Sequence, residues 1–401
     1  MQNIGQHRPQ SFPCFFLAHA FHLGASTRSL APLTITIERV THRITRTKAV
    51  ALDLHRLVHQ PQRGAVMKAF IENLPKAELH VHLEGTLEPE LSFALAKKNG
   101  IAIEYDTPQA LLAAYDFNDL PSFLAIYYRA MKVLRYEEDF FELTWQYLLK
   151  AHSQNVVYAE MFFDPQAHTS RGVGFDAVIR GIRRAQELAA SELGLQTQLI
   201  LCFLRDLTAE SALQTLQQAL PYKDWIVGVG LDSDEKDNPP VKFAEVFSRA
   251  RVAGFKLTMH CDVNQQDTLT HLHQCLETIG VDRIDHGINS LEDPSLIETI
   301  RARGLGLTVC PVSNRFCVQD LTASHIKRML QLGMRATINS DDPAYFRAYM
   351  NENLIALHEE GDVSRDEIVQ LVKNSFVVAW LDEERRSKYL SAVEEYVRQA
   401  A

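Results

Sequence analysis

Cysteine is scarce in this sequence, and its cysteines are not paired. The six cysteines are scattered over 401 residues, and none forms a C-x-x-C motif. A chain of this length buries enough apolar surface to fold without disulfides, so we expect reduced thiols and a cytoplasmic location. The sequence also lacks any apolar run approaching the ~20 residues that a membrane-spanning helix needs. We therefore expect no membrane partner.

Positive charge is the second shortage. The chain holds 41 lysines and arginines against 50 acidic residues, a formal net charge of −9. This balance gives no electrostatic reason to expect nucleic acid or an anionic membrane as partner. The P-C-x-x-C zinc motif of nucleic-acid deaminases is absent as well. Small neutral or cationic substrates remain open.

Acidic residues are rare only near the N-terminus. Residues 1–66 hold eight basic residues and only Glu38 and Asp53 on the acidic side, which leaves a net charge of −15 for residues 67–401. The segment fits neither a secretory signal nor a transit peptide well, because its apolar run lacks a basic start and a small-residue cleavage site. We predict that residues 1–66 are an unstructured or mis-started extension and that residues 67–401 form the folded domain.

Short apolar runs alternate with longer amphipathic stretches from Met67 onward, as in βα units with a parallel sheet. Eight runs are present: "AELHVHLEG", "NVVYAEMFF", "TQLILCFL", "WIVGVGLD", "KLTMHCD", "DRIDHGI", "LGLTVCP" and "RATINSDD". Eight such repeats predict an α/β fold, a (β/α)₈ TIM barrel. The interval from Glu88 to Asn155 is mostly helical in pattern and is predicted to be a helical insertion after the first strand.

Polar residues end several of these runs. They are His80 and His82 in the first run, His260 in the fifth, His286 in the sixth, and Asp341 with Asp342 in the eighth. Catalytic groups of a barrel lie at the C-terminal ends of its strands, where the loops converge. His80 and His82 are two residues apart, so both side chains point to the same face of a strand and are able to share one ion.

The pattern predicts a metal site. Zinc accepts histidine nitrogen and carboxylate oxygen, and a catalytic site keeps one position for water. The predicted ligands of one Zn²⁺ per subunit are His80, His82, His260 and Asp341. His286 is then free to orient that water and take its proton, with Asp285 or a neighbouring carboxylate fixing its tautomer.

Each of these residues also has a simpler structural explanation. A single histidine at a strand end is usually a hydrogen-bonded core residue, and an isolated H-x-H pair is weak evidence for a metal. The ordered set across four strands carries the prediction. Cys310, a candidate soft ligand, lies within an apolar run and is predicted to be a packing residue.

Several motifs resemble those of the adenosine/adenine deaminase family of the amidohydrolase superfamily. They are "ELHVHLEGTL", "IDHGI", "TVCPVSN" and "INSDDPAYF"; "FFDPQAHT" and "GLDSDEKDNPPVKF" resemble its adenine deaminase branch. The resemblance runs from about Met67 to the C-terminus. It implies a zinc-dependent barrel that adds hydroxide to C6 of a purine and expels the 6-amino group.

The resemblance also implies roles for individual residues. His80, His82, His260 and Asp341 match the zinc ligands, and His286 matches the histidine that orients the attacking water. Asp342 matches a carboxylate that contacts the purine. Glu84, Gly85 and the turn from Ser233 through Asp234 to Glu235 occupy the region that recognises the purine edge.

One family motif is missing. The fifth strand of these deaminases ends in His-Ala-Gly-Glu, whose glutamate protonates a ring nitrogen, whereas this chain has His260, Cys261, Asp262 and Val263. General acid assistance is typically worth ~10²–10⁴-fold, so its loss matters. We favour Asp262 as the replacement acid. Asp234 or Glu235 as the acid, and a degenerate binder, are the alternatives.

The substrate is the least determined part of the prediction. The resemblance is nearest to deaminases of adenine and N6-substituted adenines such as isopentenyladenine or methyladenine, which yield hypoxanthine plus ammonia or an amine. Aromatic residues in "YDFNDLPSFLAIYY" and "MFFDP" would line a pocket for an N6 group or belong to the helix core. Adenosine deamination, a non-catalytic zinc-containing purine binder and a homo-oligomer stay open. An amide or lactone hydrolase is disfavoured, because no lysine ends a middle strand.

Overall fold

The structure is a computed structural model that describes residues 64–117 and 119–400. Residues 1–63 of the predicted N-terminal extension lie outside this part of the chain. Residues 64–66 begin a helix over 64–73 that leads into the first strand. No helix in the described residues is long and apolar enough to cross a membrane.

All eight predicted runs form parallel strands. The strands are β1 (Lys76–His82), β2 (Val156–Phe163), β3 (Gln196–Leu204), β4 (Ile226–Asp232), β5 (Lys256–Leu257), β6 (His260–Cys261), β7 (Arg283–His286), β8 (Gly306–Val309) and β9 (Arg335–Ile338). They pair in the orders β1-β2-β3-β4-β5 and β6-β7-β8-β9. The predicted fifth strand is the one that is divided, into β5 and β6.

Hydrogen bonds continue across the two places where regular pairing stops. Between β5 and β6, the Thr258 N–H donates to the Val229 carbonyl (3.0 Å) and the Met259 carbonyl accepts from the Asp285 N–H (2.9 Å). A parallel bridge joins Val81 of β1 to Asp341, just after β9. The strands therefore return to the first strand, and the predicted (β/α)₈ fold class is confirmed.

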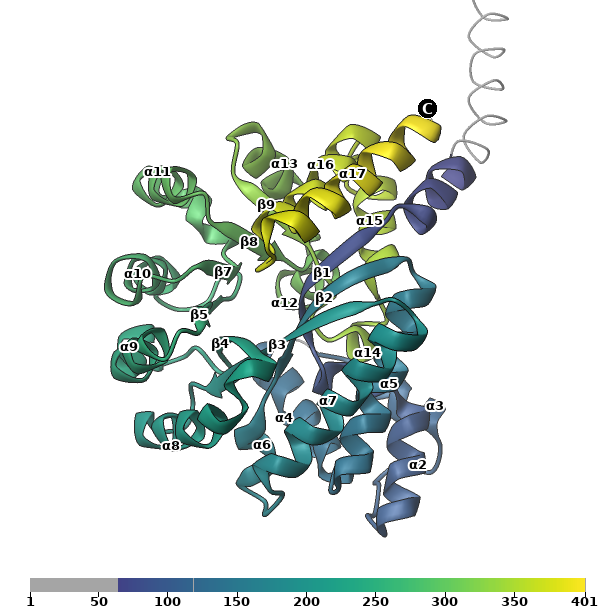
Figure 1. The fold of residues 1–401 in the computed structure, drawn as a ribbon, viewed down its shortest axis with the longest axis vertical. Coiled ribbons are helices and arrows are strands. Elements are labelled where there is room, and N and C mark those ends of the chain that lie inside the picture. Colours follow the sequence, from purple (N-terminus) through teal and green to yellow (C-terminus); the bar gives the residue numbers. More distant parts are fainter. Residues whose placement is uncertain (1–63, 118, 401) are drawn as a thin grey trace, which may run out of the picture. The chain divides into compact units, whose positions relative to one another are not determined.

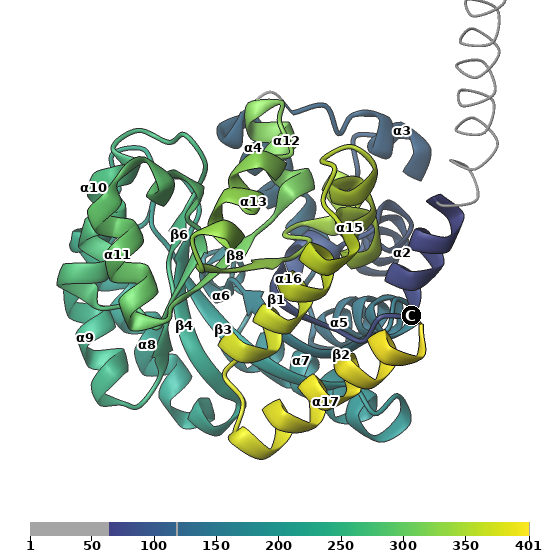
Figure 2. The same ribbon diagram turned by 90° about the horizontal axis from the view of Figure 1, so that it is seen from above.

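Helices cover the outer face of the strands (Figure 1). After the second strand they are α6 (Pro165–Thr169), α7 (Phe175–Glu192), α8 (Ala209–Ala219), η3 (Leu220–Trp225), η4 (Pro240–Phe243), α9 (Ala244–Val252), α10 (Thr268–His273), η5 (Gln274–Ile279), η6 (Ile288–Glu292), α11 (Pro294–Arg303), α12 (Pro311–Val318), α13 (Ala323–Gln331), α14 (Pro343–Phe346), α15 (Met350–Glu359), α16 (Arg365–Val378) and α17 (Glu383–Gln399). Figure 2 shows α8 to α11 on one side of the strands and α16 with α17 on another.

The predicted helical insertion follows β1. It contains η1 (Glu84–Thr86), α2 (Pro89–Asn99), α3 (Pro108–Ala113), α4 (Leu120–Ala130), η2 (Met131–Val133) and α5 (Glu137–Ser153). The last of these, α5, packs against α7, as an ordinary outer helix of the barrel does. A proline at the first turn and a capping box between Asp119 and Ser122 start α4 at the mouth of the barrel.

A buried ion pair crosses the interior of the barrel. The Arg283 guanidinium on β7 donates to the Glu160 carboxylate on β2, and both side chains are fully buried. The Trp380 ring lies 4.2 Å from the same guanidinium, and its backbone N–H donates to Glu160. Phe162, Ile200 and other apolar side chains fill the neighbouring space. The interior is therefore a packed core that closes the site from below.

Candidate active site

Three histidine nitrogens and one carboxylate oxygen converge at the C-terminal ends of the strands. The Nε2 atom of His260 lies 3.2 Å from Nε2 of His80 and 3.1 Å from Nε2 of His82. Oδ1 of Asp341 lies 3.1 Å from Nε2 of His80 and 3.5 Å from Nε2 of His82. Ligands at 2.0–2.2 Å from a tetrahedral zinc ion are separated by roughly 3.3–3.6 Å. The four atoms are therefore spaced as zinc ligands are.

The tautomers of two histidines are fixed by their outer nitrogens. Nδ1 of His80 lies 2.9 Å from the Thr308 hydroxyl, which itself donates to Asp285, so the histidine must donate. Nδ1 of His260 lies 3.1 Å from the Leu231 carbonyl, which only accepts. Burial lowers the pKa of both imidazoles and favours the neutral form. Two Nε2 lone pairs thus face each other, an arrangement that a cation stabilises.

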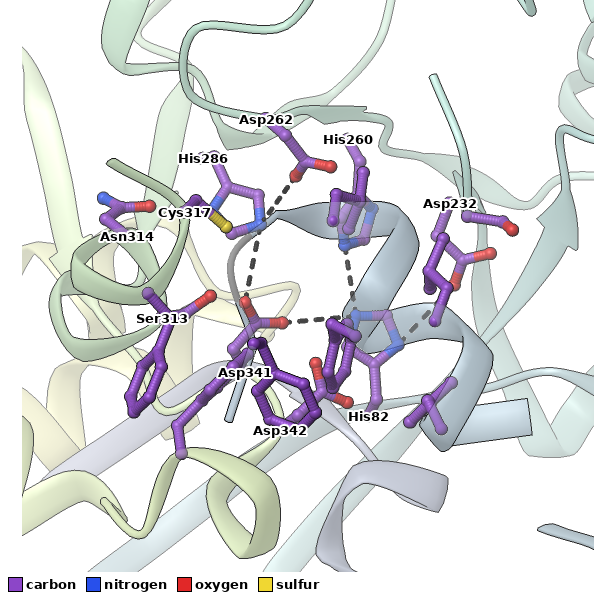
Figure 3. A pocket seen from close by; sticks show the side chains of 18 of the residues that line it. His82, Asp232, His260, Asp262, His286, Ser313, Asn314, Cys317, Asp341 and Asp342 are labelled. Carbon is purple, nitrogen blue, oxygen red and sulfur yellow. Dashed lines mark hydrogen bonds and ion pairs between the residues drawn. The ribbon is translucent and has the colours of Figure 1, made fainter. Parts of the chain in front are cut away.

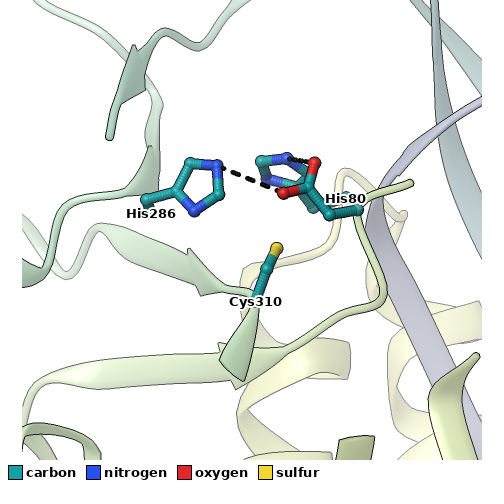
Figure 4. A group of neighbouring side chains, drawn as sticks. His80, His286 and Cys310 are labelled. Atoms are coloured by element: carbon teal, nitrogen blue, oxygen red, sulfur yellow. Dashed lines mark hydrogen bonds and ion pairs between the residues drawn. The ribbon is translucent and has the colours of Figure 1, made fainter. Parts of the chain in front are cut away.

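A second set of possible ligands shares some of these residues. His80, His286, Cys310 and Asp341 also lie together (Figure 4), with the two imidazoles turned to the carboxylate. The Cys310 thiol donates to the Thr308 carbonyl, and burial raises its pKa well above the usual range. A protonated thiol is a poor ligand. This geometry favours the packing role predicted for Cys310.

His286 and Asp262 form a pair beside the four candidate ligand atoms (Figure 3). Nε2 of His286 lies 3.1 Å from Oδ1 of Asp262 and 3.7 Å from Oδ2 of Asp341. Burial raises the pKa of Asp262 to about 7, against the effect of His286. Burial lowers the pKa of His286, but Asp262 and Asp341 outweigh it and leave that pKa raised. The pair therefore shares a proton near neutral pH.

Strained backbone positions two of these side chains. His286 has φ of 56° and Asp341 has φ of 66°, in the left-handed region that non-glycine residues rarely adopt. Both residues stand at the end of a strand, where the break in extended conformation turns the side chain into the mouth of the barrel. Strain of this kind, of order 1–3 kcal/mol per residue, typically marks functional sites.

Glu235 holds the loop that carries Asp262. Its Oε1 atom accepts the Asp262 N–H at 2.5 Å, and its Oε2 atom lies 2.9 Å from Nδ1 of His271 and 3.4 Å from Arg205. Both alternative acids face elsewhere: Glu235 is used in this network, and the Asp234 carboxylate accepts the N–H of Lys236 in its own turn. Neither lines the cavity, whereas Asp262 does.

The predicted purine-contacting residues occupy two positions. Asp342 and Ser233 line the cavity. Glu84 and Gly85 lie behind it: one Glu84 oxygen accepts the Asp164 N–H (3.1 Å) and contacts His168 (2.7 Å). A Cβ on Gly85 would lie 2.1 Å from Oδ1 of Asp342. Glu84 and Gly85 therefore support residues at the cavity wall.

Asp285 does not contact His286 through a hydrogen bond, although the sequence suggested it as the group that fixes this histidine. Its carboxylate accepts from Thr308 (2.9 Å) and Thr258 (2.6 Å) and so orients His80 through Thr308. Asp285 and His286 are consecutive on β7, so their side chains diverge. The neighbouring carboxylate at His286 is Asp262.

The cavity above the candidate ligand atoms combines acidic and apolar walls. Its empty space, open solvent included, is about 680 Å³. Six aspartates line it: Asp119, Asp164, Asp232, Asp262, Asp341 and Asp342. Among the described residues no lysine or arginine lines it. The apolar wall comes largely from α4 and α12 and includes Phe117, Leu120, Phe123, Leu124, Phe316 and Phe346.

Asp164 and Asp232 were missed by the sequence analysis. Asp164 precedes a proline at the start of α6, where an aspartate normally caps a helix, and Asp232 ends β4. Oδ2 of Asp232 lies 3.5 Å from Nδ1 of His82. The available signal was their position at the end of a predicted strand, the criterion used for the histidines.

Comparisons with known proteins cover most of the chain. The adenosine deaminase family model matches residues 75–396. A deaminase of Schizosaccharomyces pombe is 49% identical over 331 residues, covering 82% of this chain and 98% of its own. An adenine deaminase of Hahella chejuensis is 46% identical over 334 residues, covering 83% and 99%. The crystal structure of an adenine deaminase from Arthrobacter aurescens matches with a TM-score of 0.78 at 40% identity, covering 81% and 99%.

Proposed function

The chain belongs to the adenosine deaminase family, and we propose that it is a zinc-dependent hydrolytic deaminase of a free purine base. The proposed substrates are adenine and adenines substituted on N6, converted to hypoxanthine plus ammonia or an amine. The observation that carries the proposal is the convergence of His80, His82, His260 and Asp341 beside the His286–Asp262 pair. Adenine deaminases that are 46% and 45% identical to this chain support the purine base.

Zinc fits the donor set. Three neutral imidazoles and one carboxylate, spaced as tetrahedral ligands, match the preferences of this ion. When bound, zinc supplies a Lewis acid that lowers the pKa of water to near neutrality. The proposed stoichiometry is one ion per subunit.

The chain's own residues move the protons. His286, whose Nε2 lies beside both Asp262 and Asp341, takes the proton of the attacking water. Asp262 gives its proton to the purine ring nitrogen next to C6 as the water adds to that carbon. Because the two side chains are 3.1 Å apart, the pair keeps a constant total charge while one group gains a proton and the other loses one. In this way Asp262 replaces the glutamate of the family, whose position is occupied here by Val263.

The cavity favours a base over a nucleotide. Six aspartates and no lysine or arginine line it within the described chain, so a phosphate group would meet repulsion and no partner. The aromatic side chains of Phe117, before α4, and Phe123, on α4, line the cavity and support an apolar substituent on N6. The second aromatic stretch considered for this pocket, "MFFDP", behaves differently. Its Phe162 packs against His80 inside the barrel, with 4.8 Å between the ring centroids.

The test is an ultraviolet assay of zinc-loaded protein against adenine, adenosine, N6-methyladenine and N6-isopentenyladenine, with products identified by chromatography. We expect hypoxanthine from adenine or a substituted base, at a rate well above that for adenosine. Tight zinc with no turnover of any of the four purines would refute the proposal and leave a purine binder. Preferred turnover of adenosine would assign the nucleoside instead.

The metal site has its own test. We expect His82→Ala and Asp341→Ala to lose bound zinc in elemental analysis, because each removes one of only four ligands. His273→Ala is the control, since this histidine is partly exposed and pairs with Asp293 away from the site. Full zinc retention in both site variants would refute the assignment.

A further inference from the structure

Asp164 and Asp342 share an unusual backbone arrangement. Each ends a strand segment, occupies the position before the first turn of a short helix, and precedes a proline. Their φ and ψ angles are −112° and 76° for Asp164, and −116° and 72° for Asp342. An aspartate here usually caps the helix, yet neither side chain does. Both carboxylates line the cavity instead.

The Asp164 carboxylate is buried but incompletely paired. Asp164 is 1% exposed and its Oδ1 atom has no hydrogen-bond partner. Asp232 is 3% exposed; its Oδ2 lies 3.5 Å from Nδ1 of His82, and its carboxylate shares a hydrogen bond with Asp164. The unmet Asp164 oxygen is costly in a protein interior, which indicates that a donor outside these residues bonds to it. These two residues form an acceptor wall, defined here as the carboxylates of Asp164 and Asp232.

The acceptor wall is held in place from behind. Glu84 accepts the Asp164 N–H at 3.1 Å and contacts Nε2 of His168 at 2.7 Å. The Arg171 guanidinium donates to Nδ1 of the same imidazole at 2.6 Å, so His168 must donate through Nε2 to Glu84. This chain of contacts positions Asp164 before any ligand arrives.

The position of Asp262 fixes which part of a purine meets this wall, and this step rests on the proposed function. Figure 3 shows Asp262 and His286 on one side of His82 and Asp232 on the other. In a purine, C6 is flanked by N1 on one side and by the imidazole ring on the other. If Asp262 faces N1, the opposite neighbour of C6 is C5, and the imidazole nitrogen N7 bonded to C5 points toward the acceptor wall.

We propose that Asp164 and Asp232 accept a hydrogen bond from the imidazole N–H of a free purine base, and that this contact selects free bases over purines substituted at N9. A free base is able to carry its single imidazole proton on N7, whereas a purine substituted at N9 has no imidazole N–H and presents only the N7 lone pair. A site built to bond an N–H rejects an analogue that lacks it, because its buried polar groups are then left unpaired.

A second metal ion is the competing occupant of the acceptor wall. One ligand atom each of His82, Asp164 and Asp232 lies within 4.8 Å of the others. Such an ion would require His82 to bind metal through both ring nitrogens, because its Nε2 already faces His260 and Asp341. A neutral imidazole has only one free lone pair, so we expect one zinc per chain.

The experiment compares two substrates and three variants, each zinc-loaded and with its metal content measured. The kcat/KM values for adenine and 9-methyladenine are determined for the wild type, Asp164→Ala, Asp164→Asn and Asp206→Ala. Asp206 is the matched control, an exposed carboxylate just after β3 that does not line the cavity. Binding of hypoxanthine and 9-methylhypoxanthine is measured by calorimetry, which needs no turnover.

We expect the wild type to prefer adenine over 9-methyladenine by at least about 100-fold. Asp164→Ala should lower kcat/KM for adenine by about 10- to 100-fold, the usual effect of losing a hydrogen bond to a charged group. Its kcat/KM for 9-methyladenine should stay within about threefold of wild type. Asp164→Asn should fall between, because it keeps one acceptor oxygen.

Equal losses on both substrates would show a merely structural role and overturn the inference, as would unchanged discrimination in both Asp164 variants. Two zinc ions in the wild type and one in Asp164→Ala would assign the acceptor wall to metal. If no substrate is turned over but the wild type prefers hypoxanthine and Asp164→Ala does not, the proposed function fails while the inference stands.

Discussion

Asp262 lies where a family glutamate is missing, one position earlier in the chain. Two contacts bring it into the site: its N–H is held by Glu235 and its carboxylate meets His286. Val263, which occupies the glutamate position, lines the cavity and is 3% exposed. The loop therefore carries its carboxyl at position 262 and an apolar side chain at position 263, where the family carries the carboxyl.

Replacing this carboxyl tests its role. We expect Asp262→Asn to lower kcat at least about tenfold with bound zinc unchanged, because an amide cannot supply the proton. Asp234→Asn is the matched control, since that carboxylate lies outside the cavity lining. A wild-type rate for Asp262→Asn, measured by the same ultraviolet assay, would move the acid role to another group.

Burial of Glu78 predicts that the stability of the protein depends on pH. Burial raises its pKa from 4.5 to about 7, against hydrogen bonds from Ser340 and Tyr147. Between pH 4.5 and 7 the folded state then holds a proton that the unfolded state has lost, so stability falls as pH rises through this window. The shift corresponds to ~3 kcal/mol.

We expect Glu78→Gln to remove this slope. Urea unfolding of both proteins at pH 5 and pH 8 measures it, and the difference between them cancels contributions from other groups. A parallel loss of stability in wild type and variant would place the titrating group elsewhere.

At the scale of elements, η1 and α14 meet at Gly85 and Asp342. A Cβ at residue 85 would lie 2.1 Å from Oδ1 and 2.7 Å from Cα of Asp342, so neighbouring backbone must move. We expect Gly85→Ala to raise KM at least about tenfold, to keep its zinc, and to lose ~1–3 kcal/mol of stability through overpacking. Steady-state kinetics and urea unfolding measure these effects.

Gly174→Ala serves as the control for this variant, because nothing lies within 4 Å of a Cβ there. Wild-type kinetics for Gly85→Ala would mean that Asp342 does not need its present position.

Strand ends were the most predictable elements. His80, His82, His260, His286 and Asp341 were chosen because each interrupts a buried run, and the structure brings them together. Asp164 was not predicted as a site residue, because an aspartate before a proline is also typical of a helix start. The break between β5 and β6 was not visible either, since "KLTMHCD" is apolar throughout its first part.

At the scale of the whole molecule, the Arg283–Glu160 pair links β7 and β2 through the interior. Removing one partner of a buried pair leaves an uncompensated charge, so we expect Glu160→Gln to lower the free energy of unfolding by ~3–5 kcal/mol. The exposed pair Arg315–Glu360 is the control. We expect Arg315→Ala to change the free energy of unfolding by less than about 1 kcal/mol. Urea unfolding of the zinc-loaded proteins decides; similar values for both variants would contradict the prediction.

The ring of strands could be predicted from eight regular repeats, whereas this interior ion pair could not. Its partners are 123 residues apart, and although both lie in predicted strands, neither run indicates which charge it pairs with. Sequence periodicity reports which face of an element is buried, but it carries no information on which buried charges meet.

His80 and Asp341, which meet at the metal-binding atoms, are separated by 261 positions along the chain. A ribosome adding ~5–20 residues per second needs roughly 10–50 s to make the second after the first. Until then the nascent chain offers imidazoles without their carboxylate. The complete ligand set is consequently able to bind metal only late in synthesis and folding, after the last strand has docked.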